Sequence, residues 1–329
     1  MSDQVAGASA LTTRPIRYGA DGVDREDLAV AVRLVTACDV AVLGGPDSGA
    51  GDVEALLTLP TTDRDAAFLA FDGDEPVGLC WVEADTTARD TFVDVFAPPG
   101  LRALEVRDLG LARGVEVAHR HRDATPEPGP WTVRSGAWTA DEDYTAVILA
   151  HGFTPVRRFY RMRIESASPL VPATAPPLPD GVALVVSDDE ATRRRICAVD
   201  NEAFLDHWHF VPREYDEWWG HMSSGSTRDP DGWWLLTVDG TDAAICLLDE
   251  SRADIGDGYV SILGVRKEFR GRGLARMLLQ RAFVHYRDIG RAGTQLGVDA
   301  ENTTGAVRLY ESVGMTAVRA MQGYALTLD

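Results

Sequence analysis

The feature that most constrains the fold of this 329-residue chain is an internal repetition. At an offset of 162 residues, His151–Arg157 falls on Val313–Arg319, and both segments contain the pattern Gly-(Phe/Met)-Thr-x-Val-Arg. Upstream, Ala67–Glu83 and Leu235–Glu250 each consist of two apolar runs joined by an Asp-Gly turn, which is typical of a β-hairpin. Two similarities in the same order indicate a duplicated domain.

A proline-rich segment separates the two halves. Five of the fifteen residues from Ser166 to Asp180 are proline, which cannot donate the backbone hydrogen bonds of a helix or a central strand. We therefore predict a first domain over residues 1–165, a stiff linker over 166–180 and a second domain over 181–329.

Charge and composition exclude several classes of protein. With a formal net charge of −19 and 45% hydrophobic residues, the chain would repel nucleic acid phosphates and is unlike a disordered protein. The four cysteines are scattered, with no zinc-like spacing, as expected of buried thiols in a reducing compartment. No apolar run has the length of a signal peptide or membrane helix. We expect a cytoplasmic protein that binds neither nucleic acid, membrane nor metal, and the sequence leaves its oligomeric state open.

The clearest candidate for chemistry is a glycine-rich turn between an apolar strand, Tyr259–Val265, and an amphipathic helix, Gly273–Tyr286. Gly271 and Gly273 lack a Cβ, so backbone N–H groups can approach a ligand, and the helix start adds partial positive charge. From Arg266 to Arg281 there are six basic residues and one acidic residue. The pattern predicts a phosphate-binding turn, although it lacks the nucleotide P-loop ending and the full dinucleotide fingerprint. The alternative is a solvated arginine face with glycines that serve only the turn.

These residues resemble the GNAT acyltransferase superfamily, whose members bind acetyl-CoA. The family's pyrophosphate motif, Arg/Gln-x-x-Gly-x-(Gly/Ala), is matched by Arg270, Gly273 and Ala275, and the strand-ending Val265 stands five residues earlier. A second family pattern follows in the same order, and it is matched by Asn302, Ala306, Leu309-Tyr310-Glu311 and Gly314-Met315. The resemblance covers roughly Ala183–Leu328. The segment Val298–Asn302 is also similar to tandem GNAT proteins of the mycothiol synthase type.

The resemblance implies an α/β (α+β) fold of two tandem GNAT-like domains, each with a mixed, mostly antiparallel sheet flanked by helices. It also implies acetyl-CoA as co-substrate, no metal, and a small-molecule amine as the acetyl acceptor. The residues that it places at the cofactor are Leu263, Val265, Arg270, Gly271, Arg272, Gly273, Leu274, Ala275, Asn302 and Tyr310.

The same resemblance suggests catalytic roles. Tyr310 would give a proton to the departing CoA thiolate, and the alternative is an ordinary half-buried tyrosine. The N–H of Val265, in a strand splayed from its neighbour, would stabilise the carbonyl oxyanion. The general base is not identified by sequence, and we take Glu250 as the working candidate. The full set of candidates, each of which is also explained as a solvated surface group, is Asp206, His207, Glu250 and Asp257.

A segment rich in tryptophan and acidic residues would line the acceptor site. Five of the eight tryptophans lie between Trp208 and Trp234, interleaved with carboxylates. In the family the corresponding segment lines the acceptor pocket, and an aromatic, acidic wall suits a cationic amine. Core packing of these rings is the equal alternative. We assign Asp206, His207 and Trp208 to the substrate.

Three hypotheses for function follow. The leading one is an N-acetyltransferase that acetylates a small, cationic amine by direct attack in a ternary complex. The second is mycothiol-synthase-like acetylation of the cysteinyl amine of a thiol-cofactor precursor. The third is a non-catalytic module that binds or senses acyl-CoA, and the joint presence of the turn and Tyr310 argues against it.

The first half of the chain lacks these features. In place of the glycine-rich turn it has Phe96–Arg102, in which the adjacent Pro98 and Pro99 have no N–H. At the 162-residue offset, Tyr310 falls on Ile148 and Asn302 falls on Ala140. We predict that the N-terminal domain binds no CoA and supports the active half. Whether it also walls the acceptor site is left open.

Overall fold

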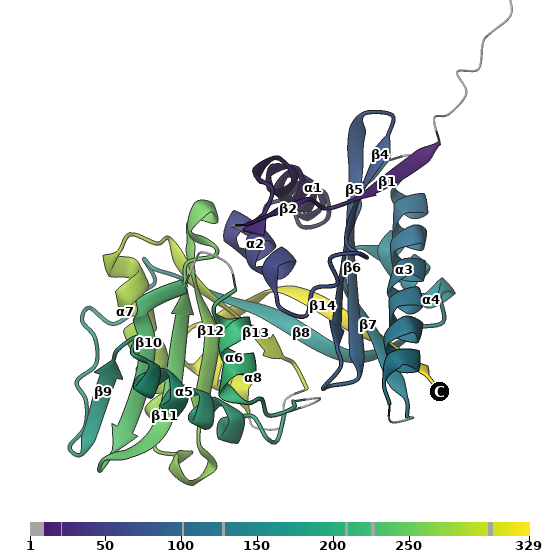
Figure 1. The fold of residues 1–329 in the computed structure, drawn as a ribbon. Coiled ribbons are helices and arrows are strands. Elements are labelled where there is room, and N and C mark those ends of the chain that lie inside the picture. The colour runs from purple at the N-terminus through teal and green to yellow at the C-terminus, as the bar shows by residue number, and fades with distance from the viewer. Residues whose placement is uncertain are drawn as a thin grey trace, which may run out of the picture. The chain divides into compact units, whose positions relative to one another are not determined.

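The computed structural model describes residues 10–20, 22–100, 102–126, 129–207, 210–224, 228–301 and 305–329. Contacts within the chain define two units, whose elements are labelled in Figure 1. Unit 1 comprises Met1–Asp47, Thr61–Val156 and Gly323–Asp329, and unit 2 comprises Ser48–Pro60 and Arg157–Gln322.

Unit 1 contains a sheet in which β1, β4, β5, β6 and β7 are successive neighbours. These pairs are antiparallel except β6 and β7, which are parallel. Helix α3 packs against β5, β6 and β7. The elements are β1 (Leu11–Pro15), β2 (Tyr18–Gly19), β3 (Gly22–Val23), α1 (Arg25–Leu43), β4 (Phe68–Asp72), β5 (Glu75–Asp85), β6 (Asp90–Phe96), α3 (Ala103–Ala124), β7 (Trp131–Trp138) and α4 (Glu142–Ala150).

In unit 2 the neighbouring strands follow the order β8, β13, β12, β11, β10, β9, and of these pairs only β12 and β13 are parallel. Its elements are α2 (Ala50–Thr58), β8 (Thr154–Glu165), β9 (Val182–Val186), α5 (Glu190–Ala203), α6 (Tyr215–Met222), β10 (Arg228–Val238), β11 (Thr241–Asp249), the 3₁₀ turn η1 (Ala253–Ile255), β12 (Asp257–Val265), the 3₁₀ turn η2 (Lys267–Phe269), α7 (Leu274–Asp288), β13 (Gly293–Asp299), α8 (Ala306–Ser312) and β14 (Thr316–Leu328). In each unit the strands are mixed, mostly antiparallel and flanked by helices, which confirms the predicted fold class.

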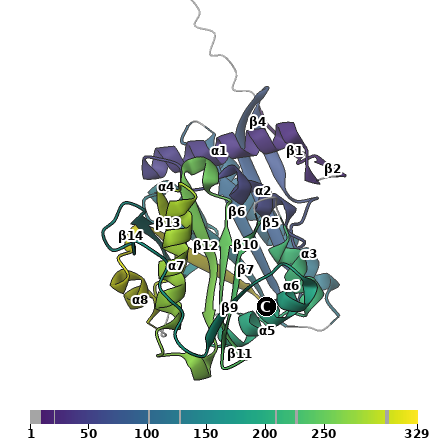
Figure 2. The ribbon, with the colours of Figure 1, turned by 90° about the vertical axis from the view of Figure 1, so that its left-hand side faces the viewer.

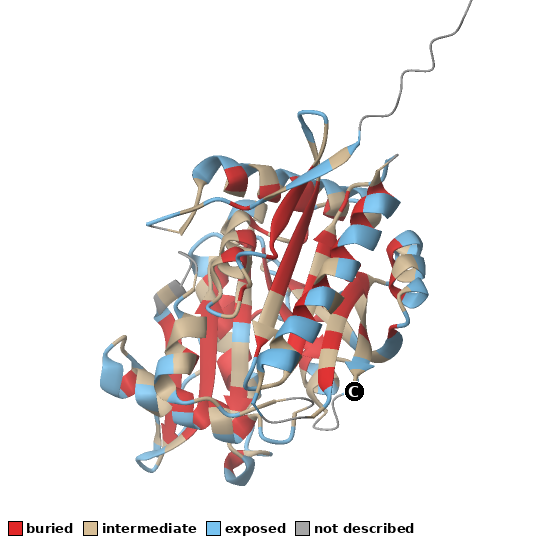
Figure 3. Ribbon diagram, turned by 45° about the vertical axis from the view of Figure 1, so that its right-hand side comes forward, coloured by how far each residue is buried: buried red, intermediate tan, exposed pale blue. Residues whose placement is uncertain are grey.

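Two helices cover opposite faces of the unit 2 sheet. Helix α7 packs against β11, β12 and β13 (Figure 2), and α5 packs against β10, β11 and β12. Alternate residues of β11 enter the two cores: Cys246 joins the cluster of α7, whereas Ile245 and Leu247 join that of α5. Buried residues concentrate on the strands, while the helices expose one side (Figure 3). The sheet therefore has an α7 face and an α5 face.

Both units contain a structural detail that the resemblance implied only for the second half. In unit 1 the parallel pairing of β6 and β7 covers three residue pairs, from Asp90↔Thr132 to Phe92↔Arg134. In unit 2 the parallel pairing of β12 and β13 also covers three pairs and ends at Tyr259↔Gln295. Beyond these pairs the two strands of each pair continue without further pairing to each other among the described residues. The two halves thus share a splayed parallel pair at the same place in their sheets.

The two units do not divide at the predicted boundaries. Strand β8 pairs with β13 from Phe159 to Glu165, so residues from Arg157 onward belong to unit 2. Strand β14 neighbours both β7 and β8, and its residues from Gly323 onward belong to unit 1. Helix α2 comes from the first half of the sequence but belongs to unit 2. Strand pairing therefore exchanges segments between the halves.

The proline-rich segment is held against unit 2. Arg287 of α7 donates to the carbonyl oxygens of Pro172 and Ala173, at 2.6 and 3.0 Å, and Arg281 donates to that of Pro176. Val171 is buried in the core of α7. Segment 166–180 is thus packed against unit 2, and carbonyl oxygens of its proline and alanine residues accept hydrogen bonds from α7.

Candidate active site

Strand β12 presents an open backbone edge. Past its last pair with β13, at Tyr259, it continues to Val265. The N–H of Arg266 donates to the Ala243 oxygen of β11 at 3.0 Å. Because backbone groups alternate along a strand, the amides of Val265 and Leu263 point to the opposite edge, toward the splay. The N–H groups of Leu263 and Val265 can therefore reach an extended ligand placed along this edge, as predicted.

The α5 face of the sheet is open beside this edge. Ser261 and Gly297 are exposed although they lie in central strands. Arg161 of β8 donates to the Tyr259 hydroxyl at 3.0 Å, and a Cβ on Gly297 would lie 3.3 Å from that oxygen. We call Arg161, Tyr259, Ser261 and Gly297 the open face. It offers solvent-accessible polar groups next to the splay.

The turn that begins α7 presents a run of unpaired amides. Gly271 and Gly273 have φ values of 78° and 79°, a left-handed conformation that favours glycine. Among the described residues no acceptor is found for the six successive N–H groups from Gly271 to Arg276. A Cβ on either glycine would meet no atom within 4 Å. These amides and the helix dipole offer hydrogen-bond donors and positive charge to an anion, with free space in front of them.

Most arginines near the turn are used within the protein. Arg270 donates to the backbone oxygens of Val265 and Ala203, at 3.0 and 2.9 Å, and lies 3.6 Å from the Asp206 carboxylate. Arg276 donates to Ser312. The guanidinium of Arg270, predicted to contact the cofactor, thus braces the end of β12 against α5. The backbone amides, among them those of the predicted Arg272, Leu274 and Ala275, are the groups left available to an anion.

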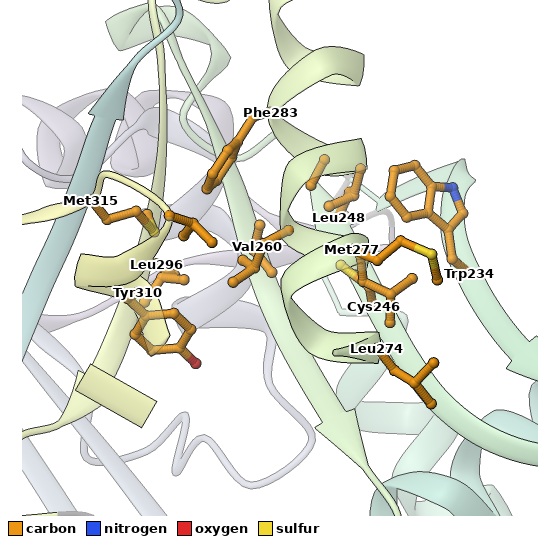
Figure 4. Close-up of a cluster of buried hydrophobic side chains, with 14 of the residues drawn as sticks. Trp234, Cys246, Leu248, Val260, Leu274, Met277, Phe283, Leu296, Tyr310 and Met315 are labelled. Atoms are coloured by element: carbon orange, nitrogen blue, oxygen red, sulfur yellow. The ribbon is translucent and has the colours of Figure 1, made fainter. Parts of the chain in front are cut away.

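Tyr310 lies on α8 and reaches the α7 face of the sheet. Its side chain is 8% exposed, and its hydroxyl has no hydrogen-bond partner among the described residues. Figure 4 shows the ring beside Leu296, with the hydroxyl pointing away from Met315. Burial raises the pKa of Tyr310 to about 12, so the phenol is protonated at neutral pH. It can therefore act as a proton or hydrogen-bond donor.

Two of the predicted base candidates lie at the other end of β12. Glu250 forms an ion pair with Arg291. It follows the β11 residue that pairs with Tyr259, and Val265 lies six steps further along β12, about 20 Å. Asp257 is buried and accepts hydrogen bonds from Arg163, at 2.6 and 2.9 Å, and from Gln295. The structure does not bring these two carboxylates to the open end of the splay.

His207 and Asp206 lie near that open end. The His207 ring packs edge-on against Phe204 with 4.5 Å between centroids, and a Cβ on Gly264 of β12 would lie 3.0 Å from the Phe204 ring. Burial, followed by the charge of Arg270, lowers the pKa of His207 below its ordinary value. The predicted Trp208 and Asn302 lie outside the described residues.

The described tryptophans of the Trp-rich segment are packing residues. Trp218, Trp233 and Trp234 are between 2% and 6% exposed. Trp219 packs edge-on against Trp233, and the Arg193 guanidinium lies 4.2 Å from its ring centroid. These four rings fit the core-packing alternative, so the open face has no wall built from them.

Sequence reasoning missed the contribution of α2. Asp52 on this helix pairs with Arg252 at 3.2 Å, and the Arg252 guanidinium lies 4.7 Å from the Tyr259 ring centroid. Asp254 accepts a hydrogen bond from the N–H of Ala50 at 2.9 Å. The partners are about two hundred residues apart in sequence, and no local pattern marks them. Spacing along the strand does not mark the open face either, because Ser261 lies at a register shift of β12 against β11.

The corresponding turn in unit 1 is built differently. Pro98 and Pro99 have no N–H, and the N–H of Ala103 donates to Gly100 at 3.2 Å. Arg102 forms ion pairs with Asp72 and Glu105, at 3.3 and 2.7 Å. The turn borders a pocket of about 420 Å³. Ile148, at the place of Tyr310, is completely buried.

Metal ligands, disulfides and membrane helices were all expected to be absent. Over the described residues, no group of three or more histidine, cysteine, aspartate and glutamate side chains is arranged to hold a metal ion. All four cysteines are free. No helix in the described part of the chain has the length and apolar character needed to cross a membrane.

Several known proteins are similar in sequence to this chain. Residues 193–315 match the family model described as "Acetyltransferase (GNAT) family". A mycothiol acetyltransferase from Thermobispora bispora is 32% identical over 262 residues, covering 75% of this chain and 79% of the relative. Another, from Propionibacterium freudenreichii subsp. shermanii, is 28% identical over 337 residues, with 96% and 92% covered.

Solved structures share the fold. A GCN5-related N-acetyltransferase from Sphaerobacter thermophilus superimposes with a TM-score of 0.76 at 25% identity, covering 96% of this chain and 95% of the other. A tandem GNAT protein from the clavulanic acid biosynthesis pathway has a TM-score of 0.70 at 16% identity, covering 97% and 98%. The second similarity supports the tandem arrangement of the fold.

Proposed function

Because this chain belongs to the GNAT acetyltransferase family, we propose that it transfers an acetyl group from acetyl-CoA to the primary amine of a small molecule, by direct attack in a ternary complex. The observation that carries this proposal is the presence of three features in unit 2. They are the free amides of the α7 turn, the open edge of β12 and the protonated Tyr310, which lies within electrostatic range of Tyr259 on β12.

Acetyl-CoA, as the co-substrate, fits these features by its chemistry. Its pyrophosphate would accept hydrogen bonds from amides between Gly271 and Arg276, where the α7 dipole favours negative charge. The amide groups of its pantetheine arm would pair with the backbone of Leu263 and Val265, as an added strand pairs with a sheet edge. Lys267 and Arg272 lie exposed near the turn and add positive charge.

The chemistry requires a neutral amine, which attacks the thioester carbonyl from the open face. A C–N bond forms, and the carbonyl oxygen gains negative charge that the Val265 N–H would stabilise. The nitrogen that has formed the bond is now positively charged and releases one proton to water, and the C–S bond breaks as the intermediate collapses. Tyr310 would give its phenolic proton to the departing thiolate and recover one from solvent.

Two acceptors are proposed. The side chain of Asp206 is half-exposed beside Arg270, and Asp299 and Glu301, which share Arg157 at 3.8 and 3.3 Å, lie at the end of β13. Three carboxylates against two guanidiniums leave a net negative charge that would attract a small cationic amine. The second acceptor is the cysteinyl amine of a thiol-cofactor precursor, because the relatives named above are mycothiol acetyltransferases.

The proposed function is tested by following free-thiol release from acetyl-CoA with a panel of amines. The panel contains a polyamine (spermidine), an amino sugar (glucosamine) and a cysteine amide, whose thiol is blocked by methylation to avoid interference. We expect at least one amine to accelerate thiol release more than tenfold and to yield an N-acetyl product by mass spectrometry. Equal rates with and without every acceptor would contradict the proposal.

We also predict one acetyl-CoA site per chain. The turn of unit 1 lacks two amide donors at Pro98 and Pro99, and its Ala103 N–H is already paired. Isothermal titration calorimetry is expected to give a stoichiometry near one, and Gly273→Val should abolish the heat. A second site of similar affinity that survives this substitution would contradict the assignment of unit 1 as a supporting domain.

A further inference from the structure

An acceptor amine must lose a proton before it attacks. A primary amine with a pKa near that of lysine, about 10.4, is almost fully protonated at neutral pH. The reaction therefore needs a group near the open end of the splay that is unprotonated at that pH and able to accept a proton.

The acidic candidates near the sheet are engaged elsewhere. Glu250 pairs with Arg291, and Asp257 is buried under Arg163 and Gln295, both at the paired end of β12. Asp206 lies at the open end, but its side chain is 54% exposed and its carboxylate lies 3.6 Å from Arg270. The Asp206 carboxylate is thus engaged by a guanidinium and faces solvent.

His207 lies at the ends of both splayed strands. Through Phe204 its ring is one side chain away from Gly264 of β12. Arg270, whose charge acts on the ring, donates to the backbone oxygen of Val265. Asp299, whose charge also acts on it, is the last residue of β13. The imidazole therefore lies one side chain away from the stretch of β12 that precedes Val265, whose amide would hold the thioester carbonyl.

The surroundings of His207 keep the imidazole neutral. Burial and the positive charge of Arg270 lower its pKa, whereas Asp299 and Asp206 act in the opposite direction. The net pKa lies below the ordinary value of about 6.5. At neutral pH the ring thus carries an unprotonated nitrogen, and its half-buried position leaves a route for a proton to solvent.

We infer that His207 accepts the proton of the acceptor ammonium in the proposed acetyl transfer, an assignment that rests on the proposed function. The proton moves from the amine nitrogen to the imidazole, directly or through one water, before the C–N bond forms. After transfer, the imidazolium returns the proton to solvent. His207 and Tyr310 then divide the two proton transfers, one on each face of the sheet.

The test compares His207→Gln with His221→Gln, a matched change at another half-buried histidine of unit 2. We expect His207→Gln to lower kcat by about 10²- to 10³-fold, the usual contribution of a positioned base. The acetyl-CoA Kd should change less than threefold, and His221→Gln should retain kcat. The wild-type to His207→Gln ratio of kcat/KM, measured from pH 5 to 9, should fall as pH drops through the His207 pKa. That ratio cancels the titration of the amine.

Free imidazole supplies a second measurement. In His207→Ala it should restore part of kcat in proportion to the concentration of its neutral form. If His207→Gln keeps kcat within threefold and keeps the acidic limb of the profile, His207 is not the proton acceptor, while the acetylation itself stands. If the wild-type protein acetylates no amine in the panel, the proposed function fails and the assignment fails with it.

Discussion

Replacing Gly273 by valine is expected to raise the acetyl-CoA Kd by about 100-fold or more. Gly273 has a φ of 79°, and a β-branched residue would turn the backbone away from this conformation at a strain of about 1–2 kcal/mol. The turn amides would then lose their common direction. Losing two charge-assisted hydrogen bonds, at about 1.5–3 kcal/mol each, would raise Kd by about 100-fold or more. The valine side chain would also enter the open space in front of the turn.

The matched control is Gly290→Val, just beyond the C-terminal end of α7. Gly290 has a φ of 85°, and a Cβ at this position would also meet no atom within 4 Å, so the backbone strain is comparable. Both variants should lose similar stability by thermal unfolding, but Gly290→Val should keep its acetyl-CoA affinity within threefold by calorimetry. Unchanged affinity in Gly273→Val would show that the anion site lies elsewhere.

Tyr310→Phe is expected to lower kcat by about 10²-fold while leaving the acetyl-CoA Kd nearly unchanged. The ring packing is kept and only the proton donor is removed, so the loss should appear in the chemical step. Because the pKa of Tyr310 is raised to about 12, its deprotonation should not limit kcat below about pH 10. Steady-state kinetics across pH 7–10 measure both effects.

Tyr286→Phe provides the contrasting control. The Tyr286 hydroxyl receives the N–H of Asp249 at 3.0 Å and donates toward the backbone oxygens of Asp249 and Tyr259, at 2.9 and 2.7 Å. Its removal leaves buried backbone groups unsatisfied and should cost about 1–3 kcal/mol of unfolding free energy. Catalysis at low temperature should be nearly normal. A Tyr310→Phe variant with full kcat would exclude the phenol as the proton donor.

Features set by local sequence were predictable. The buried face of α7 was expected from the spacing of Leu274, Met277 and Leu278, and all three are buried. The β10–β11 hairpin turns at Asp239-Gly240, where both residues have positive φ, as a tight hairpin requires. Such elements follow from periodicity and turn chemistry within a few residues.

Features set by distant contacts were not predictable. Arg270 matches the family motif, but its guanidinium binds the Ala203 oxygen, and only the folded position of α5 makes that oxygen available. Asp52 reaches Arg252 because α2 packs in unit 2. The assignment of Glu250 as a base used its position after a hairpin, whereas its pairing with Arg291 depends on the loop after α7. These contacts depend on tertiary packing, which residue spacing does not encode.

The exchange of segments between the units has a consequence for synthesis on the ribosome. Tyr324, Leu326 and Leu328 of β14 pack in the core of unit 1, although most of that unit is translated before residue 157. Unit 1 therefore cannot complete its sheet until unit 2 has been translated. Unit 2 in turn requires α2, which leaves the ribosome early. Cutting the gene at the proline-rich segment would give a first fragment without β14 and a second fragment without α2. Neither half is therefore expected to fold stably without the other.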